Sequence, residues 1–235
     1  ISNITHDLKT PITSIKGYAE GIIDGVADTD EKKDRYIRTI YDKTKDLDRL
    51  LNELTYYSSI DNNKIPYNFH RIDVGDFFAD CVEEVGMDLE NKDIELIYEN
   101  LLQPGTRIIA DPIQLRKVVN NIIGNSVKYM NKSHGEISIR LLDAVDSVRF
   151  EIEDNGKGID NKDLSNIFER FYRTDASRNS AQGGSGIGLS IVKKIIEDHG
   201  GYIWATSKEG EGTCMHFVIR KYVEVNPEGE SNEID

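Results

Sequence analysis

Near the start of the chain, three side chains with reactive groups lie within five residues: His6, Asp7 and Thr10. A neutral imidazole is a nucleophile near pH 7, and a carboxylate bonded to its other nitrogen holds it in one tautomer. Apolar residues recur here at steps of three and four, which predicts an amphipathic helix with His6 and Thr10 on its polar face. We interpret His6 as a reactive histidine, and a solvated histidine on a polar face is the simpler alternative.

A second polar set lies on a helix predicted over residues 111–129. Asn121, Asn125 and Lys128 are spaced by four and three residues and so share one helix face, and Tyr129 follows directly. Amide oxygens suit hydrated Mg²⁺, and a lysine neutralises anionic charge. The pattern predicts a magnesium or phosphate site, with an ordinary solvated helix face as the alternative.

The strand predicted over residues 147–154 ends in a carboxylate followed by two glycines, Asp154, Gly156 and Gly158. A carboxylate at a strand end can accept a hydrogen bond from an exocyclic amine such as that of adenine. The glycines would let the backbone approach closely. This motif predicts a base-binding site, and an ordinary Asn-Gly turn is the alternative.

Glycines also open the last predicted helix, over residues 185–199. Gly184, Gly186 and Gly188 would let backbone N–H groups surround phosphates at a positive helix N-terminus. The pattern lacks the lysine of a P-loop, and its place after a polar loop argues against a dinucleotide fingerprint. Arg173, which precedes that loop, is a candidate ligand for a terminal phosphate, and we interpret the loop as a lid.

Two long helices, predicted over residues 1–26 and 30–59, should form an antiparallel hairpin because only a short turn joins them. A hairpin cannot bury two apolar stripes by itself, so we expect two copies to pair as a dimeric four-helix bundle. The strands and helices that follow predict an α/β sandwich. Predicted strands cover residues 67–72, 95–101, 135–142, 147–154, 202–207 and 213–220, and predicted helices cover residues 74–91, 111–129, 162–167 and 185–199.

The predicted fold class is therefore α+β multidomain, a helical hairpin followed by an α/β sandwich. The limits are 1–62 for the hairpin, 63–66 for a linker, 67–223 for the sandwich and 224–235 for an acidic, disordered tail.

Composition limits the kinds of partner and of compartment that we expect for this chain. The 235 residues carry a formal charge of −13, which argues against nucleic acid or an anionic membrane surface as a general partner. No apolar run is long enough to cross a bilayer.

Cys81 and Cys214 are too few for a disulfide framework or a metal cluster, and we expect buried, reduced thiols. Because the chain starts inside the first apolar stripe, without methionine, we expect a fragment of a longer protein.

Taken in order, these motifs resemble the catalytic core of a bacterial two-component sensor histidine kinase, over residues 1–222. The departures from the family pattern are mild: Lys9 replaces the usual arginine, Ser126 an alanine, Met130 a small hydroxyl residue and Ile187 a leucine. The matching motifs are the phosphoacceptor box at 5–11, the N box at 121–129, the glycine boxes at 154–158 and 184–189, the phenylalanine box at 167–173 and a last glycine motif at 210–213.

The resemblance implies a role for each matching residue. His6 would receive the γ-phosphoryl group of ATP, Asp7 would polarise or deprotonate it, and Thr10 would position water for dephosphorylation of a partner. Asn125 with Asn121 would hold Mg²⁺. The adenine would be read by Asp154, the phosphates would meet Lys128, Tyr129 and Arg173, and further nucleotide contacts are expected at Gly156, Gly158, Ile159, Tyr172, Gly184, Ser185, Gly186, Ile187, Gly188, Leu189 and Thr213.

The resemblance also implies cofactors and partners. The cofactors would be ATP and Mg²⁺, and the partners a second copy of the chain and the receiver domain of a response regulator. Contact with a membrane would come only through N-terminal segments outside this sequence. The chain would then be the cytoplasmic fragment of a plasma-membrane-anchored protein. Transfer within one chain or across the dimer depends on the handedness of the hairpin, which the sequence leaves open.

Two other functions compete with that of a kinase. One is a non-catalytic dimeric scaffold that only senses ATP. The other is a hydrolytic ATPase of the related topoisomerase and chaperone fold. The ATPase is disfavoured because those enzymes carry a glutamate, which can activate water, where Asn121 stands.

Overall fold

A computed structural model describes residues 2–61, 67–174 and 186–224, without the side chains of residues 2–4, 6, 7, 53, 57, 60 and 61. A helical N-terminal region followed by an α/β sheet region confirms the predicted fold class. The chain divides into two compact units, Ile1–Pro66 with Asn166–Ile191, and Tyr67–Ser165 with Val192–Asp235. The limits predicted from the sequence stay predictions. The linker at 63–66 and tail residues 225–235 lie outside the described residues.

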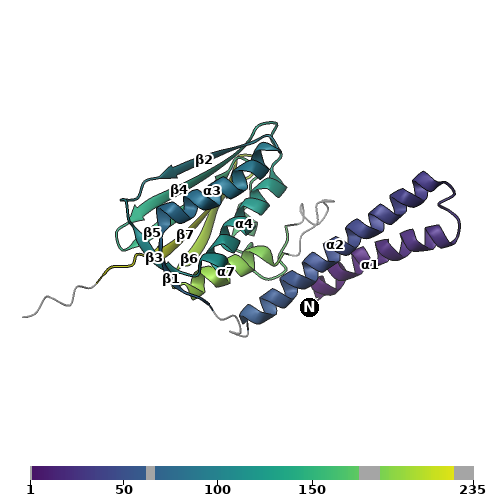
Figure 1. Ribbon diagram of the computed structural model, residues 1–235, viewed down its shortest axis with the longest axis horizontal. Coiled ribbons are helices and arrows are strands. Elements are labelled where there is room, and N and C mark those ends of the chain that lie inside the picture. The colour runs from purple at the N-terminus through teal and green to yellow at the C-terminus, as the bar shows by residue number, and fades with distance from the viewer. Residues whose placement is uncertain (1, 62–66, 175–185, 225–235) are drawn as a thin grey trace, which may run out of the picture. The chain divides into compact units, whose positions relative to one another are not determined.

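Helices α1 (Ser2–Ile23) and α2 (Asp30–Asp61) run antiparallel and form the predicted hairpin (Figure 1). Helix α1 ends three residues earlier than predicted because Gly25 adopts a left-handed backbone conformation, with φ +73°. At the start of α2, the Thr29 hydroxyl accepts a hydrogen bond from the Lys32 N–H group (3.2 Å) and so caps the helix. Within the described residues, no helix combines the length and apolar content needed to cross a bilayer.

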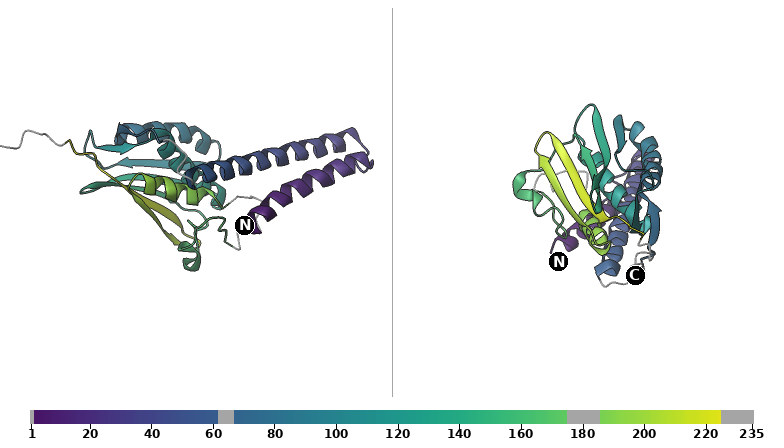
Figure 2. Two further views of the ribbon diagram at one scale, coloured as in Figure 1. Left: turned by 90° about the horizontal axis from the view of Figure 1, so that it is seen from below. Right: turned by 90° about the vertical axis from the view of Figure 1, so that its left-hand side faces the viewer.

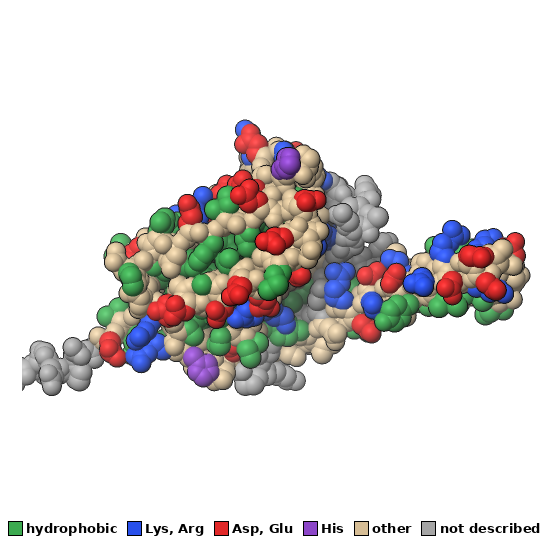
Figure 3. All heavy atoms as spheres, turned by 45° about the horizontal axis from the view of Figure 1, so that its top comes forward, with side chains coloured by type: hydrophobic (Ala, Val, Ile, Leu, Met, Phe, Trp, Pro, Cys, Tyr) green, Lys and Arg blue, Asp and Glu red, His purple; other side chains and the backbone are tan. Residues whose placement is uncertain are grey.

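The two hairpin helices pack through an aromatic contact. The rings of Tyr18 and Tyr36 meet edge to face, with 4.9 Å between their centroids. Gly21 leaves room for this contact, because a Cβ atom there would lie 2.8 Å from the Tyr36 ring. Basic and acidic side chains lie side by side over the hairpin surface (Figure 3). Ile12 and Ile37 are more than half exposed, so part of the apolar stripe is not covered by the residues that the structure describes.

The second unit contains a five-stranded sheet in the order β2-β4-β5-β7-β6 and a two-stranded ladder of β1 and β3. Strands β2 and β4 are parallel, and the other pairs are antiparallel. Strand β3 was not predicted from the sequence. The strands are β1 (His70–Asp73), β2 (Ile94–Asn100), β3 (Arg107–Ala110), β4 (Gly135–Ala144), β5 (Ser147–Asp154), β6 (Tyr202–Lys208) and β7 (Gly212–Arg220).

Helices α3 (Val74–Glu90) and α4 (Pro112–Tyr129) lie on one side of this sheet, together with α7 (Gly188–Asp198) from Val192 onward (Figure 2). Aspartates cap α3 and α4, as the side chain before each helix accepts backbone N–H groups of the first turn. Helix α5 (Asn161–Leu164) is a single turn, shorter than predicted.

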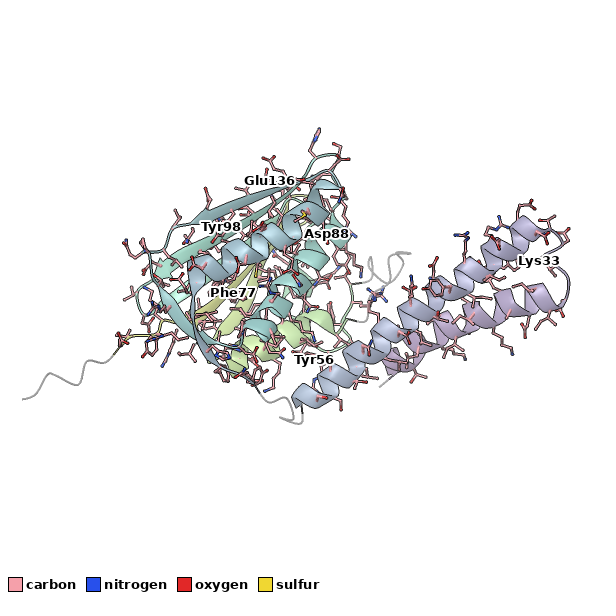
Figure 4. All side chains as sticks on the ribbon, in the orientation of Figure 1. Lys33, Tyr56, Phe77, Asp88, Tyr98 and Glu136 are labelled. Atoms are coloured by element: carbon pink, nitrogen blue, oxygen red, sulfur yellow. The ribbon has the colours of Figure 1, made fainter. Side chains whose placement is uncertain are left out.

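The core lies between these helices and the sheet. Its centre is a column of three buried rings, Phe78, Phe150 and Phe217, with centroid distances of 4.9 and 4.5 Å. Figure 4 labels Tyr98 on β2, whose hydroxyl donates a hydrogen bond to the Gly75 carbonyl at the start of α3 (3.3 Å). Apolar residues of the strands face this core at every second position, which is the pattern of a sheet covered on one face.

Buried His199 joins the start of α4 to the end of α7. Its Nε2 atom accepts a hydrogen bond from the Asp111 N–H group (3.0 Å), and its Nδ1 atom bonds the Ile195 carbonyl (2.7 Å). The rings of Tyr67 and Phe69 pack against it, with centroids 5.5 and 5.0 Å away. Burial lowers the pKa of His199 below its ordinary value of 6.5. The fold therefore requires a neutral imidazole here.

Acidification is expected to weaken this junction. Because the pKa of His199 is lower in the folded protein, the unfolded chain binds the proton more readily, so the free energy of unfolding falls as the pH drops below about 6.5. His199→Gln should flatten the decline of the melting temperature between pH 7 and pH 5. His216, whose pKa is lowered by burial too, should supply the remaining slope.

The control for this measurement is His134→Gln, at an exposed position on the same unit. It is expected to keep the wild-type dependence of melting temperature on pH. An unchanged slope in His199→Gln would contradict the assignment.

Candidate active site

The predicted phosphoacceptor lies in the first turns of α1. Residues 5–11 are helical, as predicted, and the side chains of Thr5 and Thr10 are exposed. The side chains of His6 and Asp7 lie outside the described residues, so their contacts stay predictions. Pro11 lies inside the helix and has no N–H group, so residue 7 lacks the usual helical donor to its carbonyl.

Asp154 ends β5, and its carboxylate is held from two sides. The Ser126 hydroxyl of α4 donates to Oδ2 (2.8 Å), and the Gly156 N–H group donates to Oδ1 (3.0 Å). Burial raises the pKa of Asp154, and the hydrogen bonds from Ser126 and from the backbones of Gly156 and Thr213 oppose that rise. A desolvated carboxylate fixed in one orientation can accept a hydrogen bond from a base amine.

The glycines after Asp154 are required by close backbone contacts. A Cβ atom at Gly156 would lie 3.0 Å from the Tyr129 carbonyl oxygen. At Gly158, where φ is +71°, a Cβ atom would lie 2.1 Å from the Lys208 carbonyl oxygen. The Lys157 N–H group between them donates to the Tyr129 carbonyl (3.1 Å). The segment after β5 is thus pressed against the end of α4 and the end of β6.

Thr213 and Ile159 belong to the same cluster through Ser207. The Ser207 hydroxyl donates to the Gly212 carbonyl (2.6 Å) and lies 2.9 Å from the Thr213 hydroxyl. It also accepts a hydrogen bond from the Ile159 N–H group (2.8 Å). Sequence reasoning did not identify Ser207 or Ser126 as site residues. A buried hydroxyl among apolar neighbours on α4 was the available signal for Ser126.

The other polar residues of α4 follow one another along the helix. Asn121 donates a hydrogen bond from its amide nitrogen to the Lys117 carbonyl (2.8 Å), which does not engage its carbonyl oxygen. Asn125 is partly buried one turn later. The Lys128 ammonium lies 4.9 Å from the centroid of the Tyr129 ring. Two amide oxygens and one lysine on consecutive turns fit a hydrated Mg²⁺ and anionic oxygens by donor type.

The segment with the remaining predicted residues belongs to the other unit and is described by itself. The Phe171 N–H group donates to the Gly186 carbonyl (3.0 Å), and Gly186 has φ +67°. A Cβ atom at Gly186 would lie 2.8 Å from the Tyr172 carbonyl oxygen. Tyr172, Arg173 and Leu189 are partly buried, Ile187 is buried and Gly188 begins α7. Gly184, Ser185 and the whole of the predicted lid, residues 175–182, lie outside the described residues.

Two family models match the chain. Residues 1–63 match the His Kinase A (phospho-acceptor) domain, and residues 110–223 match the histidine kinase-, DNA gyrase B-, and HSP90-like ATPase domain. The matches therefore cover both the segment with His6 and the segment with Asn121, Asp154 and Thr213.

Curated relatives agree with these matches. The chain is 31 % identical over 220 residues to the sensor histidine kinase WalK of Bacillus subtilis, covering 93 % of this chain and 36 % of that protein. It is 32 % identical over 222 residues to the sensor protein kinase WalK of Staphylococcus aureus strain MRSA252, with the same coverage. The chain thus spans about a third of the length of these relatives.

Among solved structures, the fold resembles that of the Acinetobacter baumannii histidine kinase AdeS, with a TM-score of 0.71 and 23 % identity over 92 % of this chain and 97 % of that one. It also resembles histidine kinase ThkA, solved in complex with response regulator protein TrrA. There the TM-score is 0.74 and the identity 24 %, over 94 % of this chain and 60 % of that one.

Asp154→Asn is expected to weaken ATP binding about 10- to 100-fold, the cost of losing a hydrogen bond to a charged group. Burial raises the pKa of Asp154, so the free energy of unfolding falls as the pH rises from 3.8 toward that pKa. At neutral pH the ionised carboxylate therefore destabilises the folded unit. The variant should therefore melt no lower than the wild type. Calorimetric titration with ATP measures the affinity, and a thermal melt measures the stability. Asp143→Asn on β4 is the control. A variant of Asp154 that loses both affinity and stability would contradict this prediction.

The close approach at Gly158 can be separated from its backbone conformation. Gly105 has a similar φ of +78°, but a Cβ atom there would meet nothing within 4 Å. We expect Gly105→Ala to lower the free energy of unfolding by about 1 kcal/mol, and Gly158→Ala by at least about 2 kcal/mol more because backbone must shift. Urea unfolding measures both, and equal losses would rule out the close contact.

Proposed function

Because the chain belongs to the two-component sensor histidine kinase family and comprises its catalytic core, we propose that it phosphorylates His6 from ATP and passes the phosphoryl group to an aspartate of a response regulator. The observation that carries the proposal is the carboxylate of Asp154, desolvated and fixed by Ser126 and Gly156 beside two glycines in close backbone contact. A phosphoacceptor segment precedes it in the same chain.

The nucleotide site supplies binding and charge neutralisation. Asp154 accepts a hydrogen bond from the adenine amine, and the backbone at Gly156 and Gly158, which lies against the ends of α4 and β6, would form part of the base site. Lys128 meets the phosphates. Arg173 belongs to the other unit and stays a predicted phosphate ligand. Asn121 and Asn125 would hold Mg²⁺, which when bound would neutralise and orient the phosphate oxygens. Phosphoryl transfer asks a protein mainly for such positioning.

The acceptor supplies the nucleophile. A neutral imidazole nitrogen of His6 forms a bond to the γ-phosphorus while the bond from that phosphorus to the bridging oxygen breaks. The departing ADP keeps the electron pair. Asp7 hydrogen-bonds the other ring nitrogen and stabilises the positive charge that develops there. The phosphoryl group then moves from His6 to an aspartate of the receiver domain.

The reverse activity is assigned to Thr10. Its side chain is exposed and lies one helical turn after His6, on the same face. In our proposal its hydroxyl orients a water molecule toward the phosphorylated aspartate of the regulator. Such a residue can support dephosphorylation without a role in phosphorylation of His6.

Two copies of the chain form the working unit in this proposal. The exposed apolar side chains of the hairpin, such as Ile12, Ile37 and Leu51, would be covered by the hairpin of a second copy. We further infer that segments outside this chain anchor the protein to the plasma membrane and that this core faces the cytoplasm. The response regulator would dock on the hairpin surface around His6 and Thr10.

Incubation with γ-labelled ATP and Mg²⁺ tests the function. The wild type should acquire an acid-labile, base-stable label, and His6→Gln should lose it entirely. His70→Gln, at an exposed histidine of β1, should keep it. Label on His6→Gln would contradict the assignment of the acceptor.

The same experiment separates the competing functions. Nucleotide binding without any label on the wild type would favour an ATP-sensing scaffold. Release of free phosphate without label would favour a hydrolytic ATPase. Either result would overturn the kinase proposal.

A further inference from the structure

The face of the sheet that points away from the core carries a cluster of three metal-ligating groups. Glu151 on β5 lies directly opposite His216 on β7, and Cys214 is two residues from His216 on the same face. All three are buried, with 7 %, 6 % and 8 % of their surface exposed. We propose that they form a binding site for one Zn²⁺-like divalent ion. The site is separate from the N-box residues, and the proposal does not depend on kinase activity.

His216 lies at a suitable distance from each of the other two ligands. Nδ1 of His216 lies 3.2 Å from Oε1 of Glu151 and 3.7 Å from Sγ of Cys214, and all three atoms lie within 4.8 Å of one another. A tetrahedral zinc ion with bonds of about 2.0–2.3 Å holds its ligand atoms roughly 3.3–3.8 Å apart. One carboxylate, one imidazole and one thiolate leave the fourth position for water.

Both ring nitrogens of His216 have polar partners that fit a metal-binding tautomer. Arg149 Nη2, which only donates, and Glu151 Oε1, which only accepts, each lie 3.2 Å from Nδ1. With the ring proton on Nε2, Nδ1 is free of a proton for a metal ion and Nε2 donates to the Thr206 hydroxyl at 2.8 Å. The Trp204 ring stacks on the imidazole, with centroids 5.0 Å apart. Such outer contacts orient the ligating histidines of metal sites.

The carboxylate is oriented in the same way. Oε2 of Glu151 accepts a hydrogen bond from Arg140 Nε (3.0 Å) and lies 2.9 Å from Arg140 Nη2. This leaves Oε1, the other oxygen, facing His216. With the ring proton on Nε2, Glu151 Oε1 and His216 Nδ1 are two acceptor atoms 3.2 Å apart, and a cation beside them offsets their repulsion.

That cation is the Arg149 guanidinium in this structure. Its Nη2 atom lies 2.6 Å from Glu151 Oε1 and 3.2 Å from His216 Nδ1, beside two of the three ligand atoms. The Nε atom of Arg149 is buried and has no hydrogen-bond partner among the described residues, which carries a desolvation cost. The side chain is 39 % exposed, so it can turn into water. An incoming ion would therefore replace one cation by another.

Ion pairs with Glu151 across the strands would account for Arg140 and Arg149. They would not account for the Cys214 thiol beside the imidazole of His216. Burial raises the pKa of Cys214 to about 12, so the thiol is protonated at neutral pH and binding must release one proton. Burial lowers the pKa of His216, which is thus neutral and able to ligate. Glu153 and Arg140 also face the cluster.

The ion would join β5 to β7 next to the candidate nucleotide site. Asp154 and Thr213, which pair across the same two strands, follow Glu153 and precede Cys214 in the chain. An ion that binds the folded unit and not the unfolded chain raises its melting temperature by mass action. A zinc-dependent rise in melting temperature is therefore an independent readout.

Cobalt titration of the reduced chain, without nucleotide or Mg²⁺, tests the proposal. One equivalent of Co²⁺ should produce thiolate-to-cobalt charge-transfer absorption and quench the fluorescence of Trp204, the only tryptophan in the sequence. Zn²⁺ should reverse both signals. Cys214→Ser should abolish the absorption, and Cys81→Ser should retain it, because Cys81 is a buried thiol on α3 away from the cluster.

Arg149→Gln gives a second test that keeps all three ligands. Removing the competing cation should tighten Co²⁺ binding about 10-fold or more, with unchanged stoichiometry. This variant also protects the test if Cys214→Ser does not fold. Equal charge-transfer absorption in Cys214→Ser and the wild type would overturn the proposal. It would also be overturned if neither the wild type nor Arg149→Gln showed absorption or quenching.

Discussion

The register between β5 and β7 is the constraint on which both sites depend. It sets Asp154 opposite Thr213 and Glu151 opposite His216, with successive residues on opposite faces of the sheet. A slip of one residue would move every one of these groups to the other face. The stacked rings of Phe150 and Phe217 favour this register, since they are buried directly opposite each other on the two strands. The apolar core thus positions the polar chemistry.

Close backbone contact is the second constraint. Gly156 and Gly158 let the chain after β5 lie against the ends of α4 and β6, where side chains would collide. This contact desolvates Asp154, and burial alone would make an ionised carboxylate unfavourable. The hydroxyl of Ser126 and the N–H group of Gly156 offset part of that cost. A carboxylate kept at an energetic disadvantage without a ligand is suited to gain a hydrogen bond from one.

In our proposal, two parts of the chain have different functions. The hairpin presents the phosphoacceptor segment, and some of its apolar side chains are not covered by the described residues of one copy, which suits assembly with a second copy. The sheet unit would bind the nucleotide at its strand ends and helix ends. Tyr67 and Phe69 pack on His199 where the chain enters that unit, so the entering segment is fixed to the ends of α4 and α7.

The sequence by itself determined the helical hairpin, most of the strands and which helix or strand carries His6, Asn125 and Asp154, because periodic apolar residues and local glycine patterns encode these elements. It missed β3, a four-residue strand that exists only by pairing with β1. It also gave no role to Ser126, Ser207 or His216. Their partners lie 28, 6 and 65 residues away in the chain, on other strands or helices. Only tertiary structure decided these contacts, because strand register and packing, not local spacing, bring such groups together.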